Sequence, residues 1–139
     1  MIDPGLEKAI RERMAKIPIV DTLAMDVTVF EPGVCEMTVP RRIDYDGVYA
    51  SFHGGLMMTA ADSAACFAIF TLAGADAQLT TTDMGIRFLA PCRSDLTVRA
   101  EVIKFGRTLC PVSVDLLDEN DTLVAVAQVS YIRMDALGG

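Results

Sequence analysis

The chain has 139 residues, of which 52% are hydrophobic and 22% charged, as is typical of one globular domain rather than a disordered segment. Its formal net charge of −7 argues against a nucleic-acid-binding protein, which normally carries a basic patch. A few local arginines can still hold the phosphates of a small ligand. We therefore expect a single domain over residues 1–139 that binds no nucleic acid.

Residues 1–18 predict an amphipathic helix at the start of the chain. Asp3 can cap this helix, Pro4 suits its first position and Pro18 ends it. Its apolar side chains fall on one stripe, formed by Leu6, Ile10, Met14 and Ile17. Two strands are predicted next, Leu23–Phe30 and Val34–Val39, with a turn at residues 31–33 between them. The polar stretch over residues 40–52 predicts a loop.

Residues 54–73 are almost all small or apolar, and Asp62 is the only charged residue among them. This run approaches the length of a membrane span. However, the charge near its centre and the lack of flanking basic clusters argue against insertion. A helix that is apolar on nearly every side is otherwise the buried helix of a globular domain. We therefore predict a central helix over about residues 54–73 and no membrane partner.

The chain after Gly74 is typical of β-strands. The predicted strands are Thr80–Leu89, Leu96–Val102, Thr108–Leu117 and Thr122–Arg133. Residues 118–121 have the composition of a hairpin turn. Several strands in succession around one buried helix indicate an α+β fold, in which an antiparallel β-sheet wraps around one long central α-helix.

The four cysteines stand singly in the sequence, with no Cys-x-x-Cys pair, and the chain contains one histidine. Structural and catalytic metal sites usually draw on clusters of these residues, so we expect no metal site. No charged segment followed by an apolar one is found at the N-terminus, which indicates no signal peptide. We expect reduced, buried cysteines and a cytoplasmic protein.

Two glycines, Gly54 and Gly55, follow His53 at the start of the central helix. The first amides of a helix have no acceptor within the helix, and the helix dipole adds positive charge there. Glycine also lets a ligand approach the backbone closely. This end can therefore serve as an oxyanion hole for a carbonyl oxygen that gains negative charge. The alternative is a tight turn into the helix with no chemical role.

Asp62 is an unusual residue for the middle of an apolar helix. Burying a carboxylate without a partner costs several kcal/mol, and its neighbours one turn away, Met58 and Cys66, carry no positive charge. Removal from water favours proton uptake by the carboxylate, which suits a general base. The alternative is a structural acid that is bonded to nearby threonine or backbone groups.

The spacing of Gly54 and Asp62 bears on quaternary structure. Eight residues along a helix correspond to about 12 Å, which is too far for one carbonyl group to reach both the Gly54 amide and Asp62. If both serve one reaction, Gly54 of one subunit must meet Asp62 of its twofold mate.

The pattern His53-Gly54-Gly55 followed by Ala61-Asp62 resembles the hotdog-fold acyl-CoA thioesterases of the phenylacetate-degradation (PaaI-like) type. Residues 82–91, Thr-Asp-Met-Gly-Ile-Arg-Phe-Leu-Ala-Pro, are similar to the strand after the helix in that family, and residues 106–108 and the closing hairpin also fit. The similarity spans about residues 20–133.

The resemblance implies a hotdog fold and the hydrolysis of an acyl-CoA thioester to the free acid and CoA. In that family, the residue matching Asp62 acts as general base or nucleophile, and the amide matching Gly54 polarises the thioester carbonyl from the opposite subunit. A hydroxyl residue near Thr81 lies by the attacking water. The resemblance also implies a homodimer or homotetramer with active sites at the dimer interface, and no cofactor besides the coenzyme A of the substrate.

Candidate substrate-binding residues follow from the same resemblance. They are His53 and Gly55 at the helix start, Met58 beside the acyl group, and Arg107 at the coenzyme phosphates. Further cations that are candidates for the phosphates are Arg87, Arg93, Lys104 and Arg133, and for each of them, as for Arg107, a solvated surface charge is the alternative. Further candidates for the acyl pocket are Met57, Phe67 and Phe88, and for them, as for Met58, core packing is the alternative.

One position departs from the family pattern. Many relatives carry an asparagine six residues before the histidine, where this chain has Gly47. The residues that could replace this asparagine are Asp44, Asp46, Tyr49 and Ser51. Two other functions stay open: a hydratase or dehydratase of 3-hydroxyacyl thioesters, and a non-catalytic acyl-CoA-binding protein, which the missing asparagine favours. The sequence does not define the acyl group.

Overall fold

The computed structural model describes residues 1–137, so the last two residues of the predicted domain lie outside the described part. The elements in chain order are α1 (Pro4–Met14), α2 (Pro18–Thr22), β1 (Asp26–Glu31), β2 (Val34–Val39), the 3-10 turn η1 (Ile43–Tyr45), α3 (Gly54–Ala73), β3 (Leu79–Phe88), β4 (Leu96–Val102), β5 (Leu109–Leu117), β6 (Leu123–Arg133) and the 3-10 turn η2 (Met134–Leu137).

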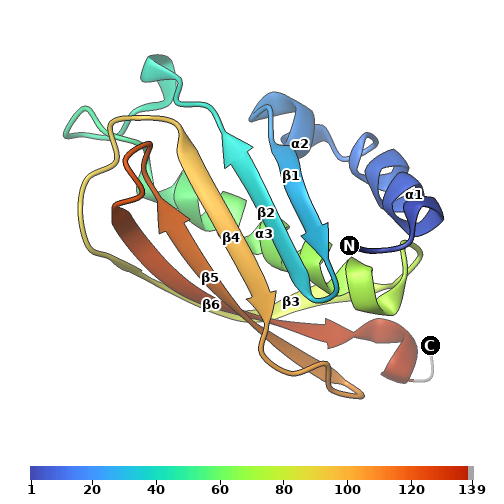
Figure 1. Ribbon diagram of the computed structural model, residues 1–139. Helices are drawn as coiled ribbons and strands as arrows, with labels where there is room; N and C mark the ends of the chain where they lie inside the picture. The colour runs from blue at the N-terminus through green and yellow to red at the C-terminus, as the bar shows by residue number, and fades with distance from the viewer. Residues whose placement is uncertain (138–139) are drawn as a thin grey trace.

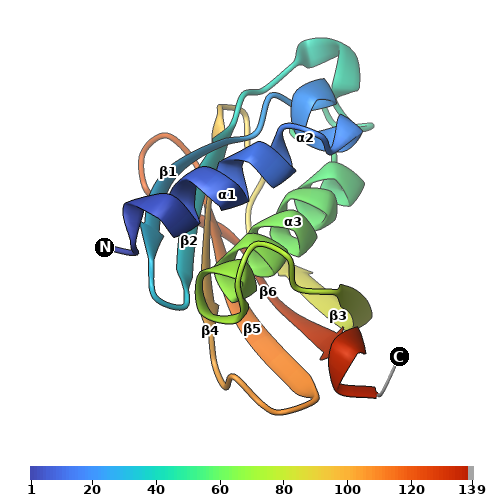
Figure 2. The same cartoon turned by 90° about the vertical axis from the view of Figure 1, so that its right-hand side faces the viewer.

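The six strands form one antiparallel sheet in the order β1-β2-β4-β5-β6-β3. This sheet curves around α3, as Figure 1 shows, and the predicted α+β architecture is confirmed. In the perpendicular view, α1 lies on the same side of the sheet as α3 (Figure 2). Strand β3 stands at one edge of the sheet and β1 at the other.

The structure corrects the predicted N-terminal elements. The first helix ends at Met14, and Pro18 does not end it but begins the short helix α2, because proline suits the first position of a helix. The following strand begins at Asp26 rather than Leu23. Residues 23–25 instead close α2 in a turn, in which Ala24 has a φ of 52° and the Met25 amide donates to the Val20 carbonyl.

Helix α3 has the predicted bounds, and both of its ends are capped. At its start the ring of His53 accepts a hydrogen bond from the Gly55 amide, and at its end Gly74 has a φ of 101°. By length and composition α3 is apolar enough to span a membrane, with a mean hydropathy of 1.6 over its most apolar window, of which 56% is buried in the fold. The core helix of a globular domain meets the same criterion.

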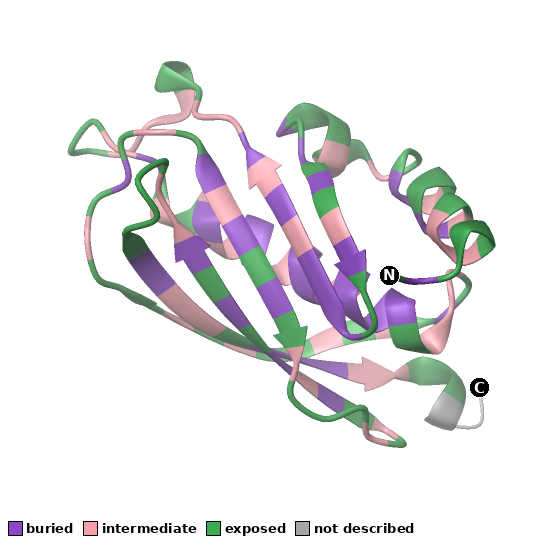
Figure 3. Ribbon diagram, viewed as in Figure 1, coloured by how far each residue is buried: buried purple, intermediate pink, exposed green. Residues whose placement is uncertain are grey.

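One stripe of α3 is left partly exposed by the sheet. Its buried side, coloured purple in Figure 3, is mostly alanine and phenylalanine, which allows the sheet to approach closely. The partly exposed stripe follows helical spacing and consists of Met58, Thr59, Asp62, Ser63 and Cys66. Asp62 is the only charged residue on it.

The buried thiol of Cys35 on β2 makes the stability of the fold sensitive to alkaline pH. Burial raises its pKa from 9.0 to about 12. As pH rises above 9, the unfolded chain loses this proton before the folded chain does, so the free energy of unfolding falls. Between pH 8 and pH 10 this thiol alone should account for a fall of about 1.4 kcal/mol. Urea unfolding of the wild type and of Cys35→Ala at both pH values measures it. Equal pH dependence in the two proteins would contradict the prediction.

Candidate active site

The carboxylate of Asp62 is held by two hydroxyl groups from the sheet. Thr81 on β3 and Tyr131 on β6 each donate a hydrogen bond of 2.7 Å to the same oxygen, Oδ1. The two donors are direct cross-strand partners in the β3–β6 ladder. Within the described part of the chain, no donor lies on the second oxygen, Oδ2, and the side chain is partly exposed. Asp62 therefore has one fixed oxygen and one oxygen available to accept a proton.

In the described part of the chain, the thiol one turn from Asp62 is protonated and no cluster of metal-binding side chains is found. Burial raises the pKa of Cys66, one turn further along α3, to about 12, so this side chain stays an uncharged thiol at neutral pH. Among the residues that the structure describes, no group of three or more histidine, cysteine, aspartate or glutamate side chains is arranged to hold a metal ion. Asp62 is thus the group at this position best suited to proton transfer.

Thr81, which was a candidate from the family resemblance, contacts Asp62 directly, whereas sequence reasoning missed Tyr131. Tyr131 is only 5% exposed and follows the buried residues Val129 and Ser130 on β6. A buried tyrosine hydroxyl needs a hydrogen-bond partner, so this residue was a detectable candidate. Its partner is 69 residues away in the chain, and only the folded structure identifies it.

Gly54 lies at the first position of α3 beside an open groove. The groove is lined by residues 51, 52, 54, 57 and 88–92. The ring of Phe88 rests on Gly54 so closely that a Cβ atom there would lie 3.0 Å from it. No acceptor for the Gly54 amide is found in the described part of the chain. The amide is therefore free to donate to a carbonyl oxygen placed in the groove.

His53 and Gly55 have structural partners of their own. The Nδ1 atom of His53 accepts a hydrogen bond of 2.9 Å from the Gly55 amide, so that amide is not free for a substrate. His53 itself is exposed and borders a second, apolar groove with Tyr45 and Leu56. These contacts place both residues next to the Gly54 amide, where they shape its surroundings.

The loop before α3 is organised by Arg41. Its guanidinium donates two hydrogen bonds to Asp46 and one each to the carbonyls of Ala50 and Arg93. The hydrogen bond from Arg41 lowers the pKa of Asp46, which stays ionised. These bonds tie both ends of the polar stretch ahead of the helix to each other and to Arg93.

The residues that were candidates to replace the missing asparagine differ in their surroundings. Asp46 is engaged by Arg41 and Asp44 by Arg42, while Tyr49 is 82% exposed at the tip of the loop. Ser51, in contrast, lines the groove beside Gly54. Of the four candidates, Ser51 is the one that lines this groove. At Gly47 itself, an added Cβ atom would be in ordinary contact, 3.8 Å from the His53 ring.

Three of the five candidate cations gather at the loop between β4 and β5. Lys104 and Arg107 are exposed on it, and Arg133 stacks over the ring of Phe105 at 4.4 Å. The loop turns tightly at Gly106, where a Cβ atom would overlap the carbonyl oxygen of Leu109. The loop adjoins the end of β6, because the amide of Arg133 donates a hydrogen bond to the carbonyl of Thr108. Arg133 lies two residues after Tyr131.

The other predicted residues are spread over the molecule. Arg87 lies on the outer face of β3, and Arg93 is exposed near the groove. Met58 is partly buried one turn before Asp62, and Met57 is buried at the groove. Phe67 is 2% exposed and belongs to the core, with its ring centroid 6.2 Å from that of Phe70.

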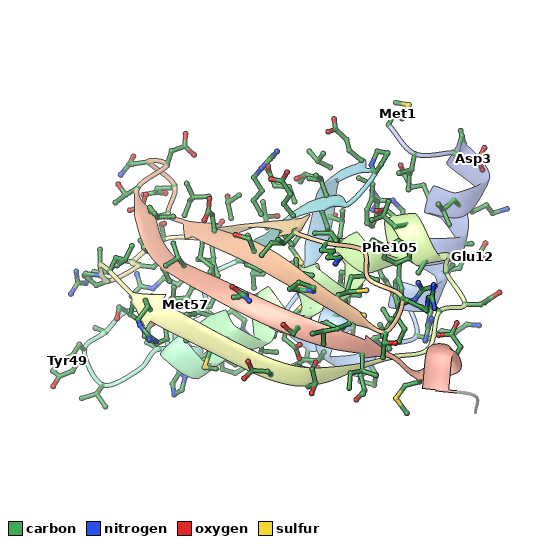
Figure 4. The ribbon with its side chains drawn as sticks, turned by 90° about the horizontal axis from the view of Figure 1, so that it is seen from below. Met1, Asp3, Glu12, Tyr49, Met57 and Phe105 are labelled. Carbon is green, nitrogen blue, oxygen red and sulfur yellow. The ribbon has the colours of Figure 1, made fainter. Side chains whose placement is uncertain are left out.

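The groove and the basic loop lie at opposite ends of the molecule. Figure 4 shows Met57 and Tyr49 at one end and Phe105 at the other. Because α3 is one continuous helix, Gly54 stays about 12 Å along its axis from Asp62. One chain thus presents the free amide and the carboxylate at separate places on the same side of β3, beside Phe88 and Thr81 respectively.

The antiparallel sheet wrapped around one long helix defines a hotdog fold. Residues 49–125 match the model of the thioesterase superfamily, and this match covers more than half of the chain. The chain belongs to the thioesterase superfamily, and the resemblance predicted from its sequence is confirmed.

Relatives and solved structures agree with this assignment. Acyl-coenzyme A thioesterase 13 of Mus musculus is 31% identical over 113 residues, covering 76% of this chain and 78% of that protein. Its Homo sapiens counterpart is 33% identical over 93 residues, covering 63% and 64%. A thioesterase family protein from Silicibacter pomeroyi has a TM-score of 0.85 at 25% identity, covering 91% and 96%. The E. coli PaaI protein shares the fold, with a TM-score of 0.82 at 18% identity over 93% and 96%.

Proposed function

We propose that the protein is an acyl-CoA thioesterase, which uses water to split an acyl-CoA thioester into the free acid and coenzyme A. The observation that carries this proposal is the Asp62 carboxylate, with Oδ1 held by two donors and Oδ2 free. Membership of the thioesterase superfamily supports the reaction type. The names of the mouse and human relatives support coenzyme A esters as the substrate class.

In the proposed reaction Asp62 acts as general base. Its Oδ2 takes a proton from water while the water oxygen bonds to the thioester carbonyl carbon. The carbonyl oxygen gains negative charge and accepts a hydrogen bond from the Gly54 amide. The carbon–sulfur bond then breaks, the proton passes from Asp62 to the sulfur, and the products are the carboxylic acid and the thiol of coenzyme A. These steps need no metal ion and no cofactor besides the coenzyme A of the substrate.

We also propose that each active site is shared between the subunits of a homodimer. Strand β3 is a ten-residue edge strand, and an exposed edge of this length favours pairing with another strand. The uncharged residues around Asp62 on the open stripe of α3 suit burial against a partner. A twofold pairing here can bring Gly54 of one subunit to Asp62 of the other, which resolves their separation of about 12 Å.

The basic loop between β4 and β5 is the proposed site for the coenzyme phosphates. Arg107 is exposed beside the tight turn at Gly106, and Lys104 and Arg133 lie on or against the same loop. Guanidinium groups bind phosphate with paired, charge-assisted hydrogen bonds. The net charge of the chain is −7, so the protein as a whole repels anionic phosphates. A local cluster of cations attracts them to this loop.

Thiol release from a panel of acyl-CoA esters tests the proposed function. The panel contains short, long and aromatic acyl groups, and each ester is assayed with and without EDTA. Release of free thiol with at least one ester, unchanged by EDTA, supports the proposal. Hydration of an enoyl-CoA without thiol release, or tight acyl-CoA binding without turnover, would contradict it.

Mixed dimers test whether the site is shared. Asp62→Asn removes the base, and Gly54→Pro removes the amide hydrogen. If one site takes Asp62 and Gly54 from different subunits, a dimer with one variant of each kind has one intact site and one doubly defective site. Random pairing during co-expression should then restore about one quarter of the wild-type activity. A mixture no more active than the two parents would place both groups of a site in one chain.

A further inference from the structure

We propose that Tyr131 is a positioning residue for hydrolysis, which together with Thr81 fixes the Asp62 carboxylate so that Oδ2 alone faces the substrate. This inference rests on the proposed thioesterase function and concerns a residue that the sequence did not single out. It follows from the hydrogen bonds around Asp62, from the burial of Tyr131 and from the pairing of the two donor strands.

The geometry separates the two carboxylate oxygens. The Tyr131 hydroxyl lies 2.7 Å from Oδ1 and 2.8 Å from the main-chain carbonyl of Asp62. A tyrosine hydroxyl has one proton, and a bond to an ionised oxygen is stronger than one to a neutral carbonyl. With Thr81 as a second donor, Oδ1 accepts two hydrogen bonds and is poorly placed to act as a base.

Tyr131 is suited to this role because it stays a donor. Burial raises the pKa of its phenol above the ordinary value, so the hydroxyl keeps its proton throughout the neutral range. Tyr131 is only 5% exposed and is flanked in the sheet by Thr81 of β3 on one side and Cys110 of β5 on the other. Its rotamer is therefore constrained by packing, and the position of its oxygen is defined by the sheet.

The bonding of Thr81 adds a consequence for the attacking water. The hydroxyl of Thr81 has one hydrogen, which it gives to Asp62. Its oxygen can therefore accept a hydrogen bond but cannot donate a second one. A water molecule that donates one hydrogen to Thr81 and the other to Oδ2 of Asp62 is oriented by both groups, with its lone pair directed away from them. By holding Oδ1, Tyr131 keeps Oδ2 in the position from which it can bind this water.

Steady-state kinetics of Tyr131→Phe test the proposal. Phenylalanine keeps the buried ring and removes only the hydroxyl. The kcat for thiol release should fall about 10- to 100-fold, the factor for one hydrogen bond to a charged group, while KM stays within twofold of the wild type. A kcat within twofold of the wild type, or a rise in KM without a fall in kcat, would overturn the inference.

Thr71→Val is the matched control for loss of a buried hydroxyl. Thr71 lies at the far end of α3. Its hydroxyl accepts a hydrogen bond from the Gly33 amide and donates one to the carbonyl of Ala68. Its removal should lower the melting temperature and leave kcat within twofold, which separates a structural effect from a positioning one. An equal loss of kcat in both variants would overturn the inference.

The two proposals fail in different ways. If the wild type releases no thiol from any ester, the proposed function itself fails. If the wild type is active and Tyr131→Phe is equally active, only the role of Tyr131 is refuted.

Discussion

Replacing Asp62 by asparagine is expected to lower kcat for thioester hydrolysis by about 10²- to 10⁴-fold, the range that general-base catalysis contributes. The asparagine oxygen can still accept the hydrogen bonds of Thr81 and Tyr131, so the side chain keeps its position. Its amide group then replaces Oδ2 and cannot take a proton from water. Steady-state thiol release measures the loss.

Circular dichroism and size-exclusion chromatography of the Asp62→Asn protein provide the control. Both should match the wild type, because the substitution keeps the shape of the side chain and removes a charge from an apolar helix. A folded variant that retains more than one tenth of the wild-type kcat with every accepted ester would show that Asp62 is not the base.

The second large effect is expected at Gly54, where proline removes the amide hydrogen without breaking the helix. Gly54 is the first residue of α3, a position that proline favours. The preceding residue, His53, has φ −62° and ψ 128°, as a residue before proline requires. Loss of one oxyanion donor should lower kcat by about 10²- to 10³-fold.

Gly54→Ala is the matched control for this change. Alanine keeps the amide hydrogen, yet its Cβ atom makes the same close approach, 3.0 Å, to the ring of Phe88. We expect Gly54→Ala to retain most of the activity that Gly54→Pro loses, in parallel assays of thiol release. If both variants lose the same activity, the contact with Phe88 matters and the amide does not.

The parts of the fold that the sequence predicted well are those set by local patterns. The central helix is bounded by a capping histidine and by Gly74 at positive φ, and both ends were visible in the sequence. Strands β2 and β4 have the predicted bounds for a similar reason, because each is a short apolar or alternating run between polar segments. Pro18 was misinterpreted because proline is compatible both with the end of one helix and with the first position of the next.

The parts that the sequence could not predict depend on long-range pairing. Asp62 was recognisable as an isolated charge, but its partners come from two strands that follow it by 19 and 69 residues. Which inward residue of β6 faces Asp62 is decided by the register of the sheet, which one sequence does not reveal. The same holds for Ser51, whose place beside Gly54 depends on the loop that Arg41 organises.

Strand β3 contacts both chemical groups of the site, Asp62 through Thr81 and Gly54 through Phe88. A β-bulge interrupts its pairing with β6 between Thr81 and Asp83. The bulge lets the two halves of the strand differ in twist and spacing. Under the proposed function, substitutions at Phe88 would reshape the groove beside Gly54 while the pairing of Thr81 with Tyr131 keeps its geometry. Selection of the substrate and activation of water would then be free to change separately.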